Sequence, residues 1–176
     1  MTGALRPAPE TALVLVVTLP AALEALRRGS ITDATGGVPP HVTLLYPFAE
    51  ESQIDADVLG VVAAIAARHP AMRLTLGEGR RFPDTLYASV EPDGQLRTLQ
   101  GELAAAFPTL PLYAGAYEFV PHVSIVEGQA ASDPHAFDDP AWSDLPVEQD
   151  VDAVDLITGR DGVWATRHRF PLGRSG

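Results

Sequence analysis

Two histidines, each followed two positions later by a hydroxyl side chain, give this sequence its clearest potential for chemistry. His41 precedes Thr43 in the first half of the chain, and His122 precedes Ser124 in the second half. Cleavage of a phosphodiester needs a base for the attacking water, an acid for the leaving oxygen and donors for the phosphoryl oxygens. Two imidazoles and two hydroxyls supply this set, so the pairing indicates one shared site.

Imidazole suits proton transfer near neutral pH. Its unperturbed pKa of about 6.5 allows one ring to be neutral and accept a proton while the other is protonated and donates one. We therefore expect a bell-shaped pH dependence, because the reaction stops when either ring has the wrong charge. His41 and His122 are the candidate acid–base pair, and Thr43 and Ser124 are the candidate phosphate donors.

Both motifs lie in sequences typical of β-strands. Residues 40–47 and 121–126 are rich in β-branched and apolar side chains, which favour extended backbone. Side chains alternate between the faces of a strand, so each histidine shares a face with its hydroxyl while the residues between them face a core. A single histidine on a strand is more often structural than catalytic. The second copy of the motif favours the shared site.

The hydrophobic periodicity predicts the elements that position these strands. The acidic stretch 128–146 contains prolines, and a short helix is expected to start in it at Asp133-Pro134. The sequence does not decide whether this stretch closes over the cleft as a lid. The other expected elements are a strand at 12–19, a helix at 20–28, a loop at 30–39, a helix at 55–68 burying Val58, Val61, Val62 and Ile65, strands at 72–76 and 85–90 joined by a long basic tip at 77–84, a helix at 95–107, a short strand at 113–119, and a closing hairpin of 151–157 with 163–170.

This order of elements is a loose duplication. A helix precedes each motif strand, and the two histidines lie about half the chain apart. The arrangement predicts two pseudo-symmetric lobes whose motif strands face each other across a cleft. We expect residues 11–173 to form a single two-lobed domain and residues 1–10 to be a flexible leader.

Composition restricts the partners of such a site. The 176 residues carry a net charge of −11, with 23 acidic residues against 12 basic ones, all arginine. Long nucleic acid is therefore not expected as a partner, because non-specific binding depends on phosphate neutralisation by basic groups. A small cluster of arginines can still attract a short phosphate-bearing substrate. The absence of cysteine excludes disulfides, thiolate metal sites and a cysteine nucleophile. Oligomeric state has no signal in the sequence.

The apolar run at 12–19 is too short to span a membrane, which takes about 20 residues. It also lacks the basic cluster that precedes a signal-peptide core, since only Arg6 comes before it. We read it as a buried first strand and expect a cytoplasmic protein.

The paired tetrapeptides 41–44 and 122–125 resemble the signature of the two-histidine (2H) phosphoesterase superfamily. Their flanks are most similar to the branch of 2'-5' RNA ligases and cyclic phosphodiesterases, over about residues 12–173. The flanking matches are Pro39-Pro40, Tyr46-Pro47-Phe48, Pro121 and the pattern at 164–173. Ser124 in place of threonine lies within the family's pattern and keeps the hydroxyl.

This resemblance implies an α+β fold in which two mainly antiparallel sheets, with helices on their outer faces, surround a central cleft. It implies no metal and no cofactor, and cleavage of a 2',3'-cyclic phosphate or a 2'-5' phosphodiester of an RNA end or small nucleotide. It also implies His122 as base and His41 as acid in ring opening to a 2'-phosphate, with the reverse direction giving ligation. Hydrolysis and ligation remain open, as does a module that binds phosphorylated nucleotides or RNA ends without turnover.

Other polar and aromatic residues have weaker functional readings. We expect His69 to be a residue of a helix end, His168 a surface strand residue, and His135 a surface residue rather than a metal ligand. Arg80 and Arg81 could face the cleft and bind a phosphate or base, although a solvated hairpin tip explains them as well. Three aromatics could stack on a nucleobase or lie in the core: Phe48, Tyr87 and Tyr117.

Overall fold

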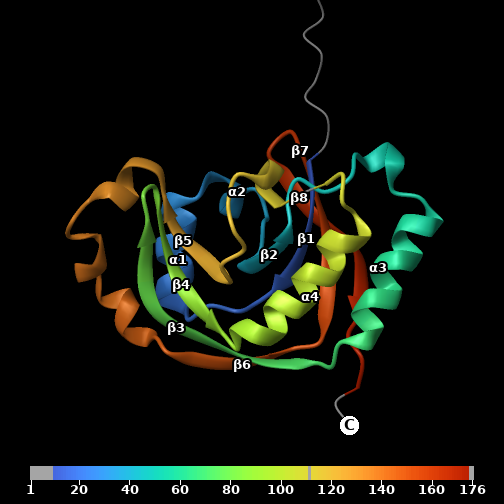
Figure 1. Cartoon of the computed structure of the whole chain (residues 1–176). Coiled ribbons are helices and arrows are strands. Elements are labelled where there is room, and N and C mark those ends of the chain that lie inside the picture. Colours follow the sequence, from blue (N-terminus) through green and yellow to red (C-terminus); the bar gives the residue numbers. More distant parts are fainter. Residues whose placement is uncertain (1–9, 111, 175–176) are drawn as a thin grey trace, which may run out of the picture.

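The computed structural model describes residues 10–110 and 112–174 and contains two four-stranded antiparallel sheets with helices (Figure 1). The strand orders are β2-β1-β7-β8 and β5-β4-β3-β6. The predicted fold class, an α+β fold of two lobes, is confirmed. The expected leader lies outside the described residues except for Glu10, which is the first residue of a strand and not part of a leader.

The first sheet contains the first motif strand. Its strands are β1 (Glu10–Val16), β2 (His41–Leu45), β7 (Ala153–Arg160) and β8 (Val163–Pro171). The central strand β1 pairs with both β2 and β7. The closing hairpin of β7 and β8 is confirmed, and it turns at Asp161 and Gly162, which have φ of 53° and 77°.

The second sheet contains the second motif strand. Its strands are β3 (Met72–Phe82), β4 (Thr85–Glu91), β5 (His122–Glu127) and β6 (Val147–Val151). The predicted long basic tip at 77–84 is wrong, because β3 continues to Phe82 and pairs with β4 as far as Thr85. Gly79 is a packing glycine and not a turn residue, since a Cβ there would lie 2.8 Å from the rings of Phe137 and Trp142.

Two further predictions of strands were wrong. β6 was not expected, and Val151 ends this strand rather than starting the closing hairpin. Its polar residues lie at the sheet edge, where Arg73 of β3 forms ion pairs with Glu148 and Asp150. At 113–119, where a strand was expected, the structure has the 3-10 helix η2 (Leu112–Gly115) and irregular backbone.

Three of the helices agree with the sequence patterns. They are α1 (Ala21–Ser30), α3 (Ala56–Arg68) and α4 (Asp93–Ala106). The Asp55 carboxylate caps α3 by accepting from the N–H groups of Asp57 and Val58. The expected buried stripe of α3 is wrong at Val61, which is 40% exposed. The buried face of this helix contains Val62, Ile65 and Ala66.

The remaining helices are short. The helix α2 (Thr32–Thr35) was expected as loop, and η1 (Glu51–Gln53) lies before α3. The acidic stretch 128–146 contains three 3-10 helices, one of which begins shortly after Asp133-Pro134, as expected. These are η3 (Gly128–Ser132), η4 (Ala136–Asp138) and η5 (Pro140–Asp144).

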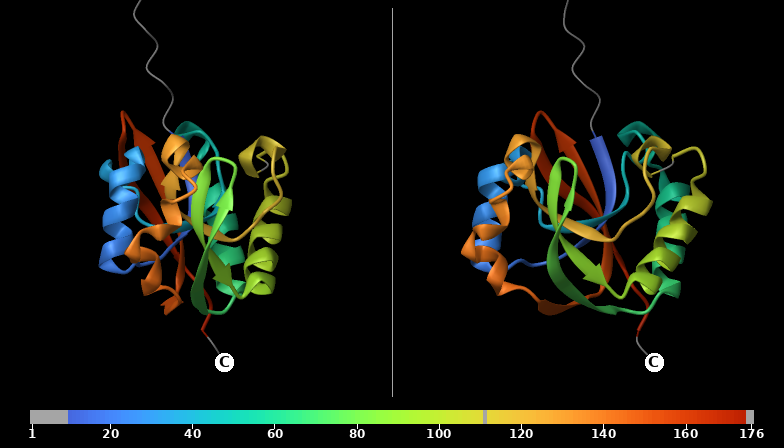
Figure 2. Two further views of the ribbon diagram at one scale, coloured as in Figure 1. Left: turned by 90° about the vertical axis from the view of Figure 1, so that its left-hand side faces the viewer. Right: turned by 60° about the vertical axis from the view of Figure 1, so that its left-hand side comes forward.

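One hydrophobic core runs through both lobes. It includes leucines of β1, β3 and α4 that are fully buried: Leu13, Leu15, Leu74, Leu76, Leu96, Leu99 and Leu103. Helix α1 packs on β5 of the second sheet, and α4 packs on β2 of the first. In both views of Figure 2, α1 lies on one side of the molecule and α3 and α4 lie on the other, with strands between them. This shared core supports our proposal that residues 11–173 form one two-lobed domain.

Among the helices of the described residues, the structure has none that is both long enough and apolar enough to cross a bilayer.

Candidate active site

The two motif strands place their histidines and hydroxyls in one pocket. β2 and β5 contact each other across the two sheets (Figure 1). His41, Thr43, His122 and Ser124 all line a pocket of about 240 Å³. The apolar residues between them, such as Val42 and Val123, are fully buried. The alternation expected from the sequence therefore exists in both strands, and the structure brings all four candidate residues together.

A β-bulge ends the alternation in β2. The register with β1 shifts so that Leu13 pairs with Leu45 and Val14 pairs with Thr43, which leaves Leu44 as the extra residue. Leu44 and Leu45 are consequently both fully buried. The next residue, Tyr46, lines the pocket. A bulge thus returns the chain to the pocket face one residue later than strict alternation would.

The second motif strand has the same irregularity at the same place. Ser124 and Val126 of β5 pair with consecutive residues of β4, so Ile125 is the extra residue. Ile125 and Val126 are both buried, at 0% and 4% exposure. Glu127, the residue equivalent to Tyr46, lines the pocket. Each lobe therefore offers a histidine, a hydroxyl and, five residues after the histidine, one further pocket residue.

Both imidazole rings are held by the backbone in the same way. Nδ1 of His41 lies 2.7 Å from the Pro39 carbonyl oxygen, and Nδ1 of His122 lies 2.7 Å from the Val120 carbonyl oxygen. A carbonyl can only accept, so Nδ1 carries the proton in each ring and donates it. Nε2 is then the nitrogen of each neutral ring that can accept a proton.

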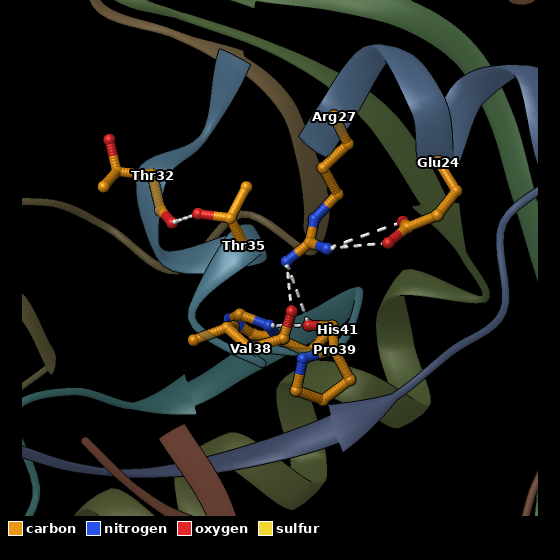
Figure 3. Close-up of polar contacts among 7 residues, drawn as sticks. All are labelled: Glu24, Arg27, Thr32, Thr35, Val38, Pro39 and His41. Carbon is orange, nitrogen blue, oxygen red and sulfur yellow. Dashed lines mark hydrogen bonds and ion pairs between the residues drawn. The ribbon is translucent and has the colours of Figure 1, made fainter. Parts of the chain in front are cut away.

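Arg27 of α1 is a pocket residue that the sequence patterns did not reveal. Its side chain is only 2% exposed, and Nη2 donates to the carbonyl oxygens of Val38 at 2.9 Å and Pro39 at 3.2 Å (Figure 3). Nη1 contacts the Glu24 carboxylate at 3.4 Å. Arg27 follows Leu23 by four residues, and both are buried on one helix face. That spacing is the signal in the sequence that it is not a solvated helix end.

The pocket lowers the pKa of both histidines. Burial, which disfavours the charged ring, is the largest cause at His41, and the positive charges of Arg27 and His122 add to it. The bond to Pro39 opposes them, and the pKa of His41 falls to about 4. Burial also lowers the pKa of His122, against the bond to Val120. Both rings are therefore neutral at neutral pH in the free pocket, and an anion bound between them would favour their protonation.

An apolar surface lies on the first-sheet side of the pocket. It contains Ala12, Val38, Ile157 and the rings of Tyr46 and Trp164. Gly159 of β7 allows Trp164 its position, because a Cβ at Gly159 would clash with the indole ring. The backbone of Trp164 donates to the Gly36 carbonyl oxygen at 2.8 Å. This surface is suited to a planar apolar group such as a nucleobase.

Two carboxylates line the same pocket, Asp33 of α2 and Glu127 of β5. Partial burial raises the pKa of Glu127, as do the negative charges of Asp33 and Asp84, while a hydrogen bond from the Ser124 hydroxyl and the charge of Arg27 lower it. The backbone N–H of Glu127 donates to Ser30 Oγ at 3.1 Å, which joins the end of β5 to the end of α1.

The aromatic residues expected as base-stacking candidates lie elsewhere. Phe48 is 5% exposed and packs edge-on against Phe107, with ring centroids 5.0 Å apart. Tyr87 is 7% exposed and stacks on Phe82 at 4.2 Å, so the core interpretation of both is correct. Tyr117 is 74% exposed. Sequence reasoning missed Tyr46 and Trp164 as pocket aromatics because their positions depend on a bulge and on a contact between strands.

The two arginines near the end of β3, Arg80 and Arg81, form bonds outside the pocket lining. Arg80 forms an exposed ion pair with Glu78 at 2.9 Å. Arg81 donates to the carbonyl oxygens of Ala131 and, at 2.9 Å, Asp133, and its guanidinium lies 5.4 Å from the centre of the Phe137 ring. Arg81 thereby attaches the acidic stretch 128–146 to the second sheet.

The other three histidines lie where they were expected from the sequence, at a helix end or at the surface. His69 ends α3 and is 8% exposed, with Nε2 3.3 Å from Glu102. His135 is exposed and lies 3.0 Å from Asp138. Within residues 10–110 and 112–174, no three carboxylate or imidazole side chains are grouped to hold a metal ion. His168 is an exposed residue of β8, as expected.

Comparisons with known proteins agree with this fold. Residues 16–163 match the family model described as the 2'-5' RNA ligase superfamily. A Bacillus cereus protein named "Putative phosphoesterase" is 30% identical over 144 residues, which cover 78% of this chain and 81% of that protein.

Two solved structures share the fold. TT0787 of Thermus thermophilus is 20% identical with a TM-score of 0.60, over 95% of this chain and 100% of that one. Escherichia coli LigT complexed with 3'-AMP is 17% identical with a TM-score of 0.58, over 94% of this chain and 99% of that one. Further structures of LigT are complexes with NADP+ and with ATP.

Proposed function

Because the chain belongs to the 2'-5' RNA ligase superfamily, we propose that it is a metal-independent phosphodiesterase that hydrolyses 2',3'-cyclic phosphates of small nucleotides or RNA ends to 2'-phosphates. Phosphoesterase activity of a general kind is supported by the family and by the named relative. One observation carries the finer proposal: two imidazoles and two hydroxyls, from strands of different sheets, line one pocket.

In this reaction each of the four residues has a distinct role. His122 takes a proton from the attacking water, the new P–O bond forms, and the P–O3' bond breaks. His41 gives a proton to the departing 3' oxygen, and the product is a 2'-phosphate. At the end of the step His122 has gained one proton and His41 has lost one. Thr43 and Ser124 donate to the phosphoryl oxygens. With an RNA 5'-hydroxyl in place of the attacking water, the same steps would form a 2'-5' phosphodiester and release the 3' oxygen, which would be ligation at the same site.

The electrostatics of the pocket support the acid role of His41. A phosphate anion between the rings stabilises imidazolium, which offsets the burial that makes both rings neutral in the free pocket. Burial and the charge of Arg27 lower the pKa of His41. The His41 imidazolium formed in the complex is therefore a strong proton donor to an alkoxide leaving group.

The size and surfaces of the pocket favour a small substrate. A volume of about 240 Å³ is slightly below the usual range of ligand sites, roughly 300–1,000 Å³, and it suits a cyclic phosphate and its sugar. We propose that the attached base stacks on Trp164 and Tyr46. The nucleotide complexes of LigT, with 3'-AMP, NADP+ and ATP, support a small nucleotide as the ligand.

The test is turnover of a nucleoside 2',3'-cyclic phosphate in the presence of EDTA. We expect a 2'-monophosphate as product, and losses of roughly 10²–10⁴-fold in His41→Ala and in His122→Ala, as for removal of a general acid or base. Thr43→Ala and Ser124→Ala are expected to lose less. Activity abolished by EDTA would indicate a metal-dependent hydrolase, and tight binding without product would indicate a binding module.

A further inference from the structure

The residues five positions after each histidine differ in kind between the lobes. The matching bulges of β2 and β5 bring Tyr46 and Glu127 to equivalent places in the pocket, one aromatic and one acidic. A carboxylate beside a hydroxyl expected to bind phosphate is unfavourable for binding an anion. The bulge in β5 nevertheless places the Glu127 carboxylate in the pocket, which suggests a role for this charge in ligand selection.

We propose that Glu127, together with Asp33, makes the pocket select its ligands by charge: it admits singly charged phosphodiesters and repels doubly charged phosphate monoesters, including the reaction product. This inference rests on the proposed function and adds a specificity-determining pair to it. A phosphodiester carries one negative charge, whereas a phosphate monoester carries about −1.5 to −2 at pH 7 because its second pKa is about 6.

The nearness of Glu127 to Ser124 makes the repulsion act at the phosphate position. Both residues line the pocket, and Ser124 lies close enough to the Glu127 carboxylate to lower its pKa. A phosphoryl oxygen that binds the Ser124 hydroxyl therefore lies near a like charge. The repulsion rises with the charge of the ligand, so it is larger for a doubly charged monoester than for a diester.

The neighbouring positive charge offsets the carboxylates only in part. The charge of Arg27 lowers the pKa of Glu127, but the same guanidinium also pairs with Glu24 at 3.4 Å. Both imidazoles are neutral in the free pocket at neutral pH, since burial lowers their pKa values. The carboxylates therefore oppose the extra charge of a monoester, and release of the product from the pocket is favoured.

The position of Glu127 is fixed from two sides. Its backbone N–H donates to Ser30 Oγ at the end of α1, and the bulge at Ile125 sets which face its side chain occupies. Asp33 comes from α2, immediately after α1, and its negative charge raises the pKa of Glu127. The two carboxylates are thus close enough to act on each other and on a ligand in the same pocket.

The experiment compares two ligands that differ by one charge. Dissociation constants are measured by calorimetry at pH 8 for a nucleoside 2'-monophosphate and for the methyl diester of the same 2'-nucleotide. We expect wild type to prefer the diester, and Glu127→Gln to reduce this preference about 10-fold by tightening the monoester. Asp33→Asn is expected to act in the same direction. Glutamine has nearly the same size and shape as glutamate and keeps an acceptor oxygen, so the variant removes the charge with little change in the pocket.

Glu78→Gln is the matched control. This carboxylate lies on β3 of the same sheet, is exposed and pairs with Arg80, so it changes the net charge equally. A ligand preference unchanged in Glu127→Gln, or changed equally in Glu78→Gln, overturns the inference. Lowering the pH to 5, where the monoester is singly charged, should remove the wild-type preference, and its persistence would also overturn it.

Binding is measured without turnover, so the two proposals fail separately. A charge preference in a protein that does not hydrolyse cyclic phosphates overturns the proposed function alone. Hydrolysis without a charge preference overturns this inference alone, and binding of neither ligand overturns both.

Discussion

Arg27 and His41 donate to the same acceptor, the carbonyl oxygen of Pro39, at 3.2 Å from Nη2 and 2.7 Å from Nδ1. The guanidinium thus holds the residue that orients the ring, and its charge disfavours the protonated form of that ring. Helix α1 and the first motif strand, β2, are thus joined through this carbonyl oxygen. Arg27 is therefore a positioning residue for His41.

Arg27→Gln should change both the stability and the proton affinity of the site. Loss of the guanidinium leaves the carbonyls of Val38 and Pro39 without their charged donor, and we expect a loss of about 1–3 kcal/mol in the free energy of unfolding. The pKa of His41 should rise, because one of the causes that lower it is removed. It should stay below 6.5, because burial is the larger cause.

Urea unfolding and NMR titration of the His41 ring measure these two effects. Arg28→Gln is the control, since Arg28 is the next residue of the same helix and is exposed. An equal shift of the His41 pKa in both variants would show that net charge, and not the Pro39 contact, is responsible.

The pH dependence of kcat/KM should be displaced toward acid. This parameter reports the pKa values of the free enzyme, and both histidines have lowered values, that of His41 falling to about 4. We expect the optimum of kcat/KM below pH 6.5 and the optimum of kcat at higher pH, because bound phosphate stabilises imidazolium. Initial rates from pH 4 to 9 distinguish the two. Identical optima above pH 7 would contradict the burial of the rings.

The lowered pKa of His41 should also make the free energy of unfolding depend on pH. The pKa of His41 is lowered from about 6.5 to about 4, so its neutral form contributes stability that is complete above pH 6.5 and is lost as the pH falls through 4. At most about 3 kcal/mol of the free energy of unfolding is lost in this window. Comparison of wild type with His41→Asn in urea at pH 7 and pH 4.5 isolates this part. His168→Asn, at an exposed strand position, should keep the wild-type slope.

Gly159→Ala should damage the apolar surface of the pocket. The added Cβ would clash with the Trp164 indole, so the ring must move away from the proposed base site. We expect KM for a nucleoside 2',3'-cyclic phosphate to rise by about 10-fold, in line with the 1–3 kcal/mol of stacking on an aromatic side chain. Glycerol 1,2-cyclic phosphate, which has no base, should be turned over as by wild type. Gly60→Ala, where a Cβ would meet nothing within 4 Å, is the control.

The motif strands were the part of the structure that local sequence could predict. His41 and His122 stand in apolar, β-branched runs, and alternation within each run correctly separated pocket side chains from core side chains. The prediction failed at the fifth residue after each histidine, because a bulge depends on the register with the neighbouring strand. Tyr46 and Glu127 were consequently not expected in the pocket.

Other differences have the same tertiary origin. Gly77 and Gly79 were read as turn residues, but β3 runs through them and Gly79 makes room for aromatic rings. Arg27 was not expected in the pocket, because its backbone acceptors lie eleven and twelve residues further along the chain. The edge strand β6 was missed because Glu148 and Asp150 make it polar, and their partner Arg73 lies on another strand.

The paired bulges have a consequence for how this enzyme could diversify. Each separates the part of the strand that holds the imidazole and hydroxyl from one further residue that lines the pocket. Substitutions at Tyr46 or Glu127 would therefore alter which molecules the pocket binds, while the imidazoles of His41 and His122 keep their backbone acceptors at Pro39 and Val120. Under the proposed function, the range of ligands could change while the acid–base pair stays the same.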